Sequence, residues 1–358
     1  MKENRNSNIE LLRIICMIFI IFHHYSFHGG YSAFNTENFN VNIFYIQEIS
    51  MLGKVACSIF AIITGYFMIN KNINLKISIK KIFKLFVIYA FYNILIILIV
   101  KSFNIDNVNF KQIFKSFLSM KDGNWYFITY FIILLIAPFL NKIIKSFEER
   151  DYKIFLIILY IIWSLIPTLI NDEWDFSNID FFIIMYMTGA YIRLYVNNIN
   201  MKKNKIVLFS SLFLLFSSVL FFDYIGMKLK LDIFIKNATY FRKMNSILTV
   251  LVAISMFNCF FNFNIKSKLI NFISQTTMGI YLIHDNIIMR HIIWQKISPN
   301  TAYMNSPYLH SLIKVSITFI LCMIIELFRI YVLEKIIINI HKNYKKVKEK
   351  YNEEYKRN

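Results

Sequence analysis

Ten long apolar runs divide the chain, and they constrain its fold more than any other feature. A membrane-spanning helix needs about 20 mainly apolar residues, and inside a bilayer a helix satisfies its own backbone hydrogen bonds. The sequence therefore predicts an all-α, polytopic integral membrane protein with about ten transmembrane helices. The runs lie at about 8–27, 49–69, 85–103, 125–144, 154–170, 179–197, 206–222, 244–263, 269–290 and 309–333.

Composition excludes the main alternatives. The chain is 57% hydrophobic and 17% charged, whereas soluble domains average roughly 45–50% apolar and about 25% charged residues. A soluble enzyme and a disordered chain are both excluded on these grounds. The net charge of +19 would suggest nucleic acid in a soluble protein, but the basic residues lie between apolar runs and in the C-terminal tail rather than in a patch with aromatics. We interpret them as topology signals and lipid contacts, and expect no nucleic-acid partner.

The distribution of Lys and Arg predicts the orientation. Short cytoplasmic loops of membrane proteins carry an excess of positive charge. With the N-terminus inside, 24 basic residues fall on the cytoplasmic side and 11 on the outer side. We therefore expect both termini in the cytoplasm, a transmembrane domain over 1–340 and a basic cytoplasmic tail over 341–358. The acidic loop at 171–178 lacks Lys and Arg and fits the outer face. The expected location is the plasma (inner) membrane, with multiple passes.

The first apolar run contains ionisable residues, which are costly in a bilayer and mark functional sites by default. Arg13 and His24 are eleven residues apart, so on a helix they share a face and lie about 16 Å apart. Glu10 is close enough to pair with Arg13, and His28 lies one turn beyond His24. The alternative is that Arg13 is an interfacial anchor and that the histidines mark the outer interface. Both interpretations remain open at this point.

No metal site is predicted. His24 and His28 have the i, i+4 spacing of a metal pair, but no third ligand or H-E-x-x-H glutamate accompanies them. The four cysteines lie inside apolar segments without C-x-x-C spacing, so neither a disulfide framework nor a zinc site is indicated.

Several motifs, in order over about 7–285, resemble those of the acyltransferase-3 family of integral-membrane acyltransferases. The first is N-x-E-x-L-R followed by ten residues and histidine, from Arg13 to His24. Lys81 and Lys84 depart from the family pattern, because arginines are usual at those positions. The other matching fragments are Thr64-Gly65-Tyr66-Phe67, the basic stretch Lys80-Lys81-Ile82-Phe83-Lys84, Asn124-Trp125-Tyr126-Phe127 with Pro138-Phe139-Leu140, and Gly279-Ile280-Tyr281-Leu282-Ile283-His284.

The resemblance implies a transferase that moves an acyl group, usually acetyl, from cytoplasmic acetyl-CoA to a hydroxyl of a bacterial cell-envelope glycan. The acceptor would be a surface or capsule polysaccharide or a lipid-linked oligosaccharide. Acetyl-CoA is then a co-substrate, and no bound cofactor is expected. Transfer to a sugar hydroxyl needs a base near neutral pKa and a stabiliser for the developing oxyanion. His24 is the candidate, as the base or as a transient acyl carrier.

Other residues are assigned by side of the membrane. Arg13, Lys80, Lys81 and Lys84 would suit the phosphates of the donor, although flanking positive charge explains each lysine at least as well. The acceptor-side candidates are His284, Asp285, Tyr281 and Trp125. Two non-enzymatic alternatives are a glycan-lipid flippase or small-solute transporter, and a scaffold in a glycan-assembly complex. The carrier would have a polar cavity but no dependence on acyl-CoA, and the scaffold would need no single intramembrane histidine.

Overall fold

The computed structural model is a bundle of helices, and it describes residues 6–31, 33–34, 40–118, 125–170 and 178–335. Over these residues there is no strand. The predicted acidic loop (except Asn178) and the predicted tail at 341–358 lie outside the described residues. The α-helices are α1 (Ser7–Phe27), α2 (Val41–Met68), α3 (Leu75–Ser102), α4 (Phe110–Leu118), α5 (Trp125–Ser146), α6 (Glu149–Tyr160), α7 (Ile166–Ile170), α8 (Asn178–Tyr195), α9 (Met201–Leu229), α10 (Asp232–Lys236), α11 (Ile247–Phe261), α12 (Lys268–Ser274), α13 (Thr277–His284), α14 (Ile287–His291) and α15 (Pro307–Phe328).

Asparagines start four of the long helices. Asn6, Asn40, Asn74 and Asn200 precede α1, α2, α3 and α9, and each side chain accepts a hydrogen bond from a backbone N–H in the first turn. Asparagine is among the best N-cap residues because its side-chain oxygen satisfies a donor that the helix leaves free. These caps fix where each apolar segment becomes helical.

All ten apolar runs lie in helical segments, so the prediction of an all-α polytopic membrane protein is confirmed. Within the described residues, eight helices are long and apolar enough to cross a membrane. The exceptions are the runs at 179–197 and 269–290. The first forms α8, which is largely buried, and the second is divided into α12, α13 and α14. Segments enclosed by other helices do not need the hydropathy that contact with lipid requires.

Contacts between helix ends show that the chain runs up and down through the bundle. At one end, Asn8 of α1 bonds the carbonyl of Phe263 after α11, and Asn141 of α5 bonds that of Met68 at the end of α2. At the other end, Asn300 bonds the carbonyl of Tyr25 near the end of α1. The first end is the cytoplasmic end in the predicted topology, which remains a prediction.

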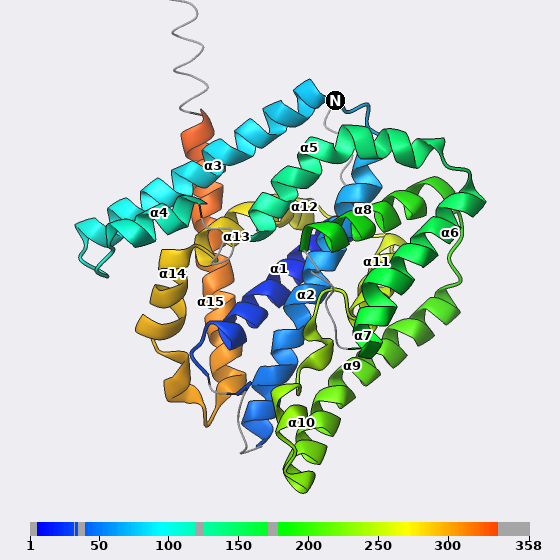
Figure 1. The fold of residues 1–358 in the computed structure, drawn as a ribbon. Coiled ribbons are helices and arrows are strands. Elements are labelled where there is room, and N and C mark those ends of the chain that lie inside the picture. The colour runs from blue at the N-terminus through cyan, green and yellow to red at the C-terminus, as the bar shows by residue number, and fades with distance from the viewer. Residues whose placement is uncertain (1–5, 32, 35–39, 119–124, 171–177, 336–358) are drawn as a thin grey trace, which may run out of the picture.

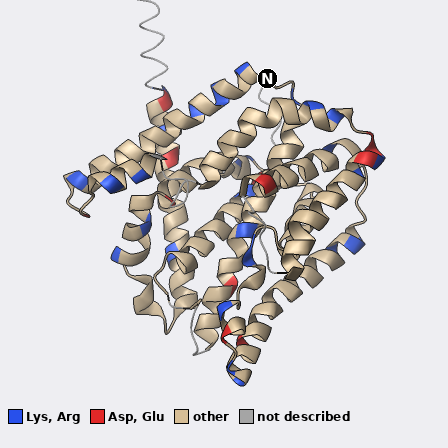
Figure 2. Cartoon of the chain, viewed as in Figure 1, with Lys and Arg blue, Asp and Glu red and all other residues tan. Residues whose placement is uncertain are grey.

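The outer faces of the bundle are apolar. Phe213 on α9 is 71% exposed and Leu98 on α3 is 58% exposed. In Figure 2, most of the helical surface has neither basic nor acidic residues. Basic residues lie along α3 and α4 and near the start of α9. Exposed apolar surface of this extent is typical of contact with lipid. The polytopic protein is therefore surrounded by the bilayer.

Helices α2 and α8 touch along their backbones in the interior. A Cβ at Gly65 would collide with the backbone carbonyl of Tyr186, and one at Gly189 would collide with that of Ile62. Small residues let membrane helices approach this closely. The contact matters for the site because Tyr66 follows Gly65 directly and Arg193 lies one turn after Gly189.

Candidate active site

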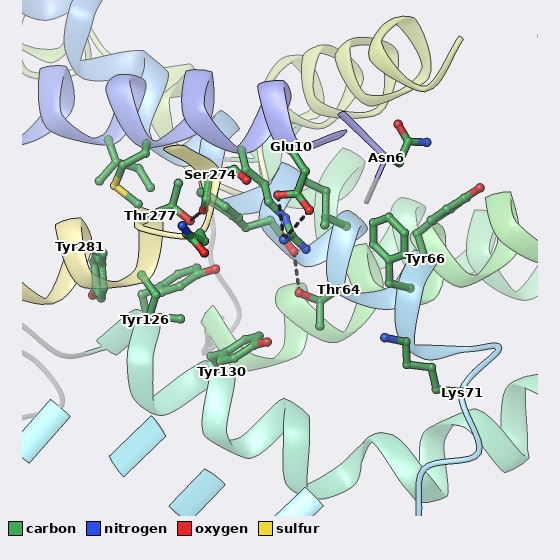
Figure 3. Close-up of a pocket in the computed structure, with 18 of the residues that line it drawn as sticks. Asn6, Glu10, Thr64, Tyr66, Lys71, Tyr126, Tyr130, Ser274, Thr277 and Tyr281 are labelled. Carbon is green, nitrogen blue, oxygen red and sulfur yellow. Dashed lines mark hydrogen bonds and ion pairs between the residues drawn. The ribbon is translucent and has the colours of Figure 1, made fainter. Parts of the chain in front are cut away.

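A cavity of about 650 Å³ extends along one face of α1 (Figure 3). The α1 residues that line it recur at helical spacing, from Glu10 and Arg13 to Met17 and Ile20. His24 is the next position on this stripe. In Figure 3, Tyr66, Lys71 and Asn6 lie toward one end, and Tyr126 and Tyr281 lie toward the other. The cavity therefore extends from the end of the bundle where α1 begins toward its middle.

Three cations line the cavity at or near its first end. Arg13 Nη1 lies 3.4 Å from the Glu10 carboxylate, as the spacing predicts. Arg193 donates to the hydroxyl of Tyr66 at 2.8 Å, and Lys71 completes the group. The predicted donor lysines are not brought to this cavity. They lie on α3, where Lys80 and Lys84 are exposed and Lys81 is half-buried.

Aromatic rings connect the second end of the cavity to the histidines. The rings of Tyr126 and Tyr281 lie 5.3 Å apart and nearly edge to face. Tyr281 is 6.3 Å from the ring of His284 on the same helix, α13. Ile20, at this end, lies one turn before His24. The cavity thus ends one helical turn short of the histidine pair.

The hydrogen bonds of the histidine pair define where its protons lie. His284 Nδ1 is 2.6 Å from the carbonyl oxygen of Ile280, and a carbonyl can only accept, so this nitrogen carries the hydrogen. In neutral His284, Nε2 is then an acceptor. His24 Nδ1 lies 3.0 Å from that Nε2, so His24 donates through Nδ1. Its Nε2 has a free lone pair and no hydrogen-bond partner among the described residues.

A carboxylate also supports His24. Asp285 Oδ1 lies 3.3 Å from His24 Nδ1 and is held in turn by Arg290 through Nε at 2.7 Å and Nη2 at 2.6 Å. An acceptor behind the ring fixes the tautomer and stabilises the imidazolium that forms when Nε2 takes a proton. His24, His284 and Asp285 are all buried. This arrangement makes His24 Nε2 either a base or a nucleophile.

A metal ion is the other chemistry that this geometry permits. The ligand atoms of His24, His28 and Asp285 lie within 4.8 Å of one another. In the structure, His24 Nδ1 is engaged by His284 and Asp285 Oδ1 by Arg290, whereas Asp285 Oδ2 has no hydrogen-bond partner among the described residues. The absence of a metal site stays a prediction.

The family comparison agrees with this site. The family model of the acyltransferase-3 proteins, described as an acyltransferase domain, matches residues 6–327. The chain belongs to this family. Searches with this chain among curated proteins and among solved structures find no match. The matched region contains both the cavity and the histidine pair, so the molecule is a membrane acyltransferase.

The structure of this acyltransferase brings together most of the predicted site residues. Arg13 and Tyr281 line the cavity, and His24, His284 and Asp285 contact one another one helical turn beyond its end. Trp125 begins α5 and is covered on one face by a cation from α2, described below.

Sequence reasoning did not identify Arg193 or Lys71 as site residues. Arg193 resembles a flanking anchor in sequence, because it lies near the end of an apolar run. The available signal was the pair of Thr-Gly steps at 64–65 and 188–189, since facing glycines bring their helices into contact. Only the pairing of α2 with α8 shows that this contact places Arg193 beside Tyr66.

Proposed function

We propose that this protein is an O-acyltransferase that moves an acyl group, acetyl in the simplest case, from cytoplasmic acyl-CoA to a hydroxyl of a cell-envelope glycan. The observation that carries the proposal is the hydrogen bonding of His24, which leaves Nε2 free one helical turn beyond the end of a cavity lined by cations. The protein would act in the plasma membrane of a bacterium, with surface polysaccharide, capsule or a lipid-linked oligosaccharide as acceptor.

The cavity suits an acyl-CoA donor. Its cationic residues, Arg13, Lys71 and Arg193, would bind the phosphates of the nucleotide end, because guanidinium and ammonium groups form charge-assisted hydrogen bonds with phosphate. The apolar and aromatic residues beyond them would enclose the pantetheine arm. Arg13 and His24 are about 16 Å apart along the helix. An extended arm over this distance places the thioester at the histidine pair.

The chemistry at His24 follows one of two routes. In the first, Nε2 takes the proton of the acceptor hydroxyl while the hydroxyl oxygen bonds to the acyl carbon. The C–S bond then breaks, and the CoA thiolate receives the proton back. In the second, Nε2 bonds to the acyl carbon of the thioester, the C–S bond breaks and CoA leaves as the thiolate. The sugar hydroxyl oxygen then bonds to the acyl carbon and displaces the imidazole, and the hydroxyl proton goes to the thiolate. His284 and Asp285 stabilise the positive charge on the His24 ring in both routes.

The acceptor would enter from the opposite side of the bundle. His24 lies near the end of α1, and the residues packed around that end come from α13, the π-helical turn Ile292–Lys296 and the segment before α15. In the predicted topology this is the outer half of the membrane. An acceptor there never needs to share the donor's cavity.

The test is transfer of radiolabelled acetyl from acetyl-CoA into surface material, with membranes containing the wild type, His24→Ala or no protein. We expect label that dilute alkali releases, as an O-ester requires, only with the wild type. Label that persists with His24→Ala would contradict the assignment of His24. No label with any sample, over a series of acyl-CoA donors, would contradict the proposed activity and favour a carrier role.

The two routes can be separated with the same label. A brief reaction without acceptor, quenched in denaturant, should leave acyl label on the wild-type protein only if an acyl-imidazole forms. Hydroxylamine should remove that label, and His24→Ala should never acquire it.

A further inference from the structure

In the described part of the chain, a lysine beside the histidines forms no ion pair. Lys54 lies on α2 next to Gly53, where a Cβ would collide with the ring of His23. Its Nζ lies over the ring of Trp125, 4.3 Å from the centroid. Within residues that the structure describes, Lys54 forms no ion pair and no hydrogen bond. Its side chain is half-buried inside the bundle.

Arg242, near the end of α1, also has its charged group against aromatic rings. Arg242 lies in the short 3-10 turn Tyr240–Arg242, and its guanidinium carbon is 5.0 Å from the ring of Phe27 and 4.9 Å from that of Phe34. Nη1 is buried without a hydrogen-bond partner in the described chain. Phe27 stacks in turn on His23, the neighbour of His24, with ring centroids 5.5 Å apart.

Among the described residues, these two cations give the surroundings of His24 more positive than negative charge. The charge of Lys54 is repelled by that of Arg242 and attracted by that of Asp285. Asp285 is already held by Arg290. On α9, which packs against the turn of Arg242, Asp223 faces Gln47 instead.

Unpaired cations within a bilayer are expensive, and those that persist usually mark a binding site. Contact with aromatic faces offsets only part of the loss of hydration. Two cations with their heads on aromatic rings are, however, well placed to hold an anion when one arrives.

We propose that Lys54 and Arg242 bind an anionic group of the acceptor, a phosphate or a carboxylate, and so place a neighbouring hydroxyl at His24. This inference rests on the proposed function and defines its acceptor as an anionic glycan. The donor phosphates are not the ligand, because Arg13, at the donor end of the cavity, lies about 16 Å along α1 from His24. A diphosphate-linked glycan lipid and an acidic polymer share the required chemistry.

The first experiment characterises the product. Membranes containing the wild-type protein are labelled from radioactive acetyl-CoA, and alkali-labile label is separated by anion exchange. We expect retention on the column. Extraction of the retained label into organic solvent would indicate a lipid-linked glycan, and its recovery in water would indicate a polymer. Label only in the neutral fraction would overturn the inference but not the proposed function. No label would overturn both.

The second experiment assigns the cations. The retained fraction, deacylated with alkali, serves as the acceptor for initial rates. Lys54→Gln and Arg242→Gln should each raise the acceptor KM by about tenfold to a hundredfold, as loss of a charge-assisted hydrogen bond predicts. The acetyl-CoA KM should stay within about twofold. Lys54→Arg, which keeps the charge, should retain a low acceptor KM. Lys236→Gln, an exposed cation of α10, is the matched control.

The kinetic pattern distinguishes binding of an anion from stabilisation of the oxyanion. If Lys54→Gln lowers kcat and leaves the acceptor KM unchanged, the lysine acts on the transition state and the inference is wrong. Sodium chloride should raise the wild-type acceptor KM and affect the two Gln variants less. An equal salt response in all of them would also overturn it.

Discussion

The hydrogen bond between His24 and His284 makes a specific kinetic prediction, because His284 acts only through His24. We consider three variants: His24→Ala, His284→Ala and the double variant. If Nε2 of His24 is the reacting nitrogen, removing His24 removes the chemistry, whereas removing His284 only loosens the ring. The effects of residues that act as one unit are strongly non-additive.

The magnitudes follow from the geometry. A positioned general base contributes about 10²–10⁴-fold, or about 2.7–5.5 kcal/mol of transition-state stabilisation, and His24→Ala should lose all of it. In His284→Ala, the His24 Nδ1–H keeps Asp285 as an acceptor at 3.3 Å. The remaining loss is about one hydrogen bond and some orientation, about 1–3 kcal/mol, which is about five- to 150-fold in rate.

The measurement is the initial rate of alkali-labile acyl transfer, normalised to the amount of folded protein by size-exclusion chromatography in detergent. The double variant should be no slower than His24→Ala. His23→Ala is the matched control, because His23 is adjacent in sequence but directs Nδ1 to the carbonyl of Ser50, at 2.6 Å. The reasoning fails if His284→Ala slows the His24→Ala protein by a further factor of ten, since His284 would then act independently.

Three other substitutions test the remaining parts of the molecule. Arg193→Gln should raise the acetyl-CoA KM about tenfold by loss of a charged phosphate contact, while Lys84→Gln, outside the cavity, should leave it unchanged in the same assay; the reverse result would restore the predicted donor lysines. Gly65→Val should lower stability by about 1–3 kcal/mol through collision of α2 with α8, seen as a lower Tm in detergent, and an unchanged Tm would contradict the close crossing. Glu326→Ala should cost about 1–3 kcal/mol, because Arg329 loses its bidentate partner and keeps only the bond from Nη1 to Glu334; full thermal stability would show that water reaches the pair.

The sequence predicts the helices of the bundle well, because an apolar segment in a bilayer must satisfy its own backbone hydrogen bonds and therefore forms a helix. All ten apolar runs are helical, and Arg13 and His24 lie on one unbroken helix, α1, with Arg13 in the cavity lining. Glu10 pairs with Arg13, as expected from i, i+3 spacing. These features depend only on one helix at a time. Local periodicity is therefore sufficient for them.

The cationic lining of the cavity depends instead on which helices meet. Lys80 and Lys84 resemble a phosphate site in sequence, but α3 turns them to the surface. Arg193 reaches the cavity because α8 crosses α2. Lys71 reaches it because the turn after α2 lines the same cavity as the start of α1. The same is true of Lys54 and Arg242, which come from α2 and from a short turn before α11. No periodicity in a single sequence encodes such pairings.

The break in the ninth apolar run explains why polar groups can meet at His24. Helix α13 ends at His284, and Asn286 caps the start of α14 by accepting from the N–H of Ile288. The chain between them leaves helical geometry, so Arg290 reaches back to Asp285 across the joint. An unbroken helix would place residues five apart on different faces. Irregular backbone is tolerated at membrane depth only where protein or a cavity encloses it. The break therefore lies where the enzyme needs a carboxylate, an arginine and a histidine to converge on one imidazole.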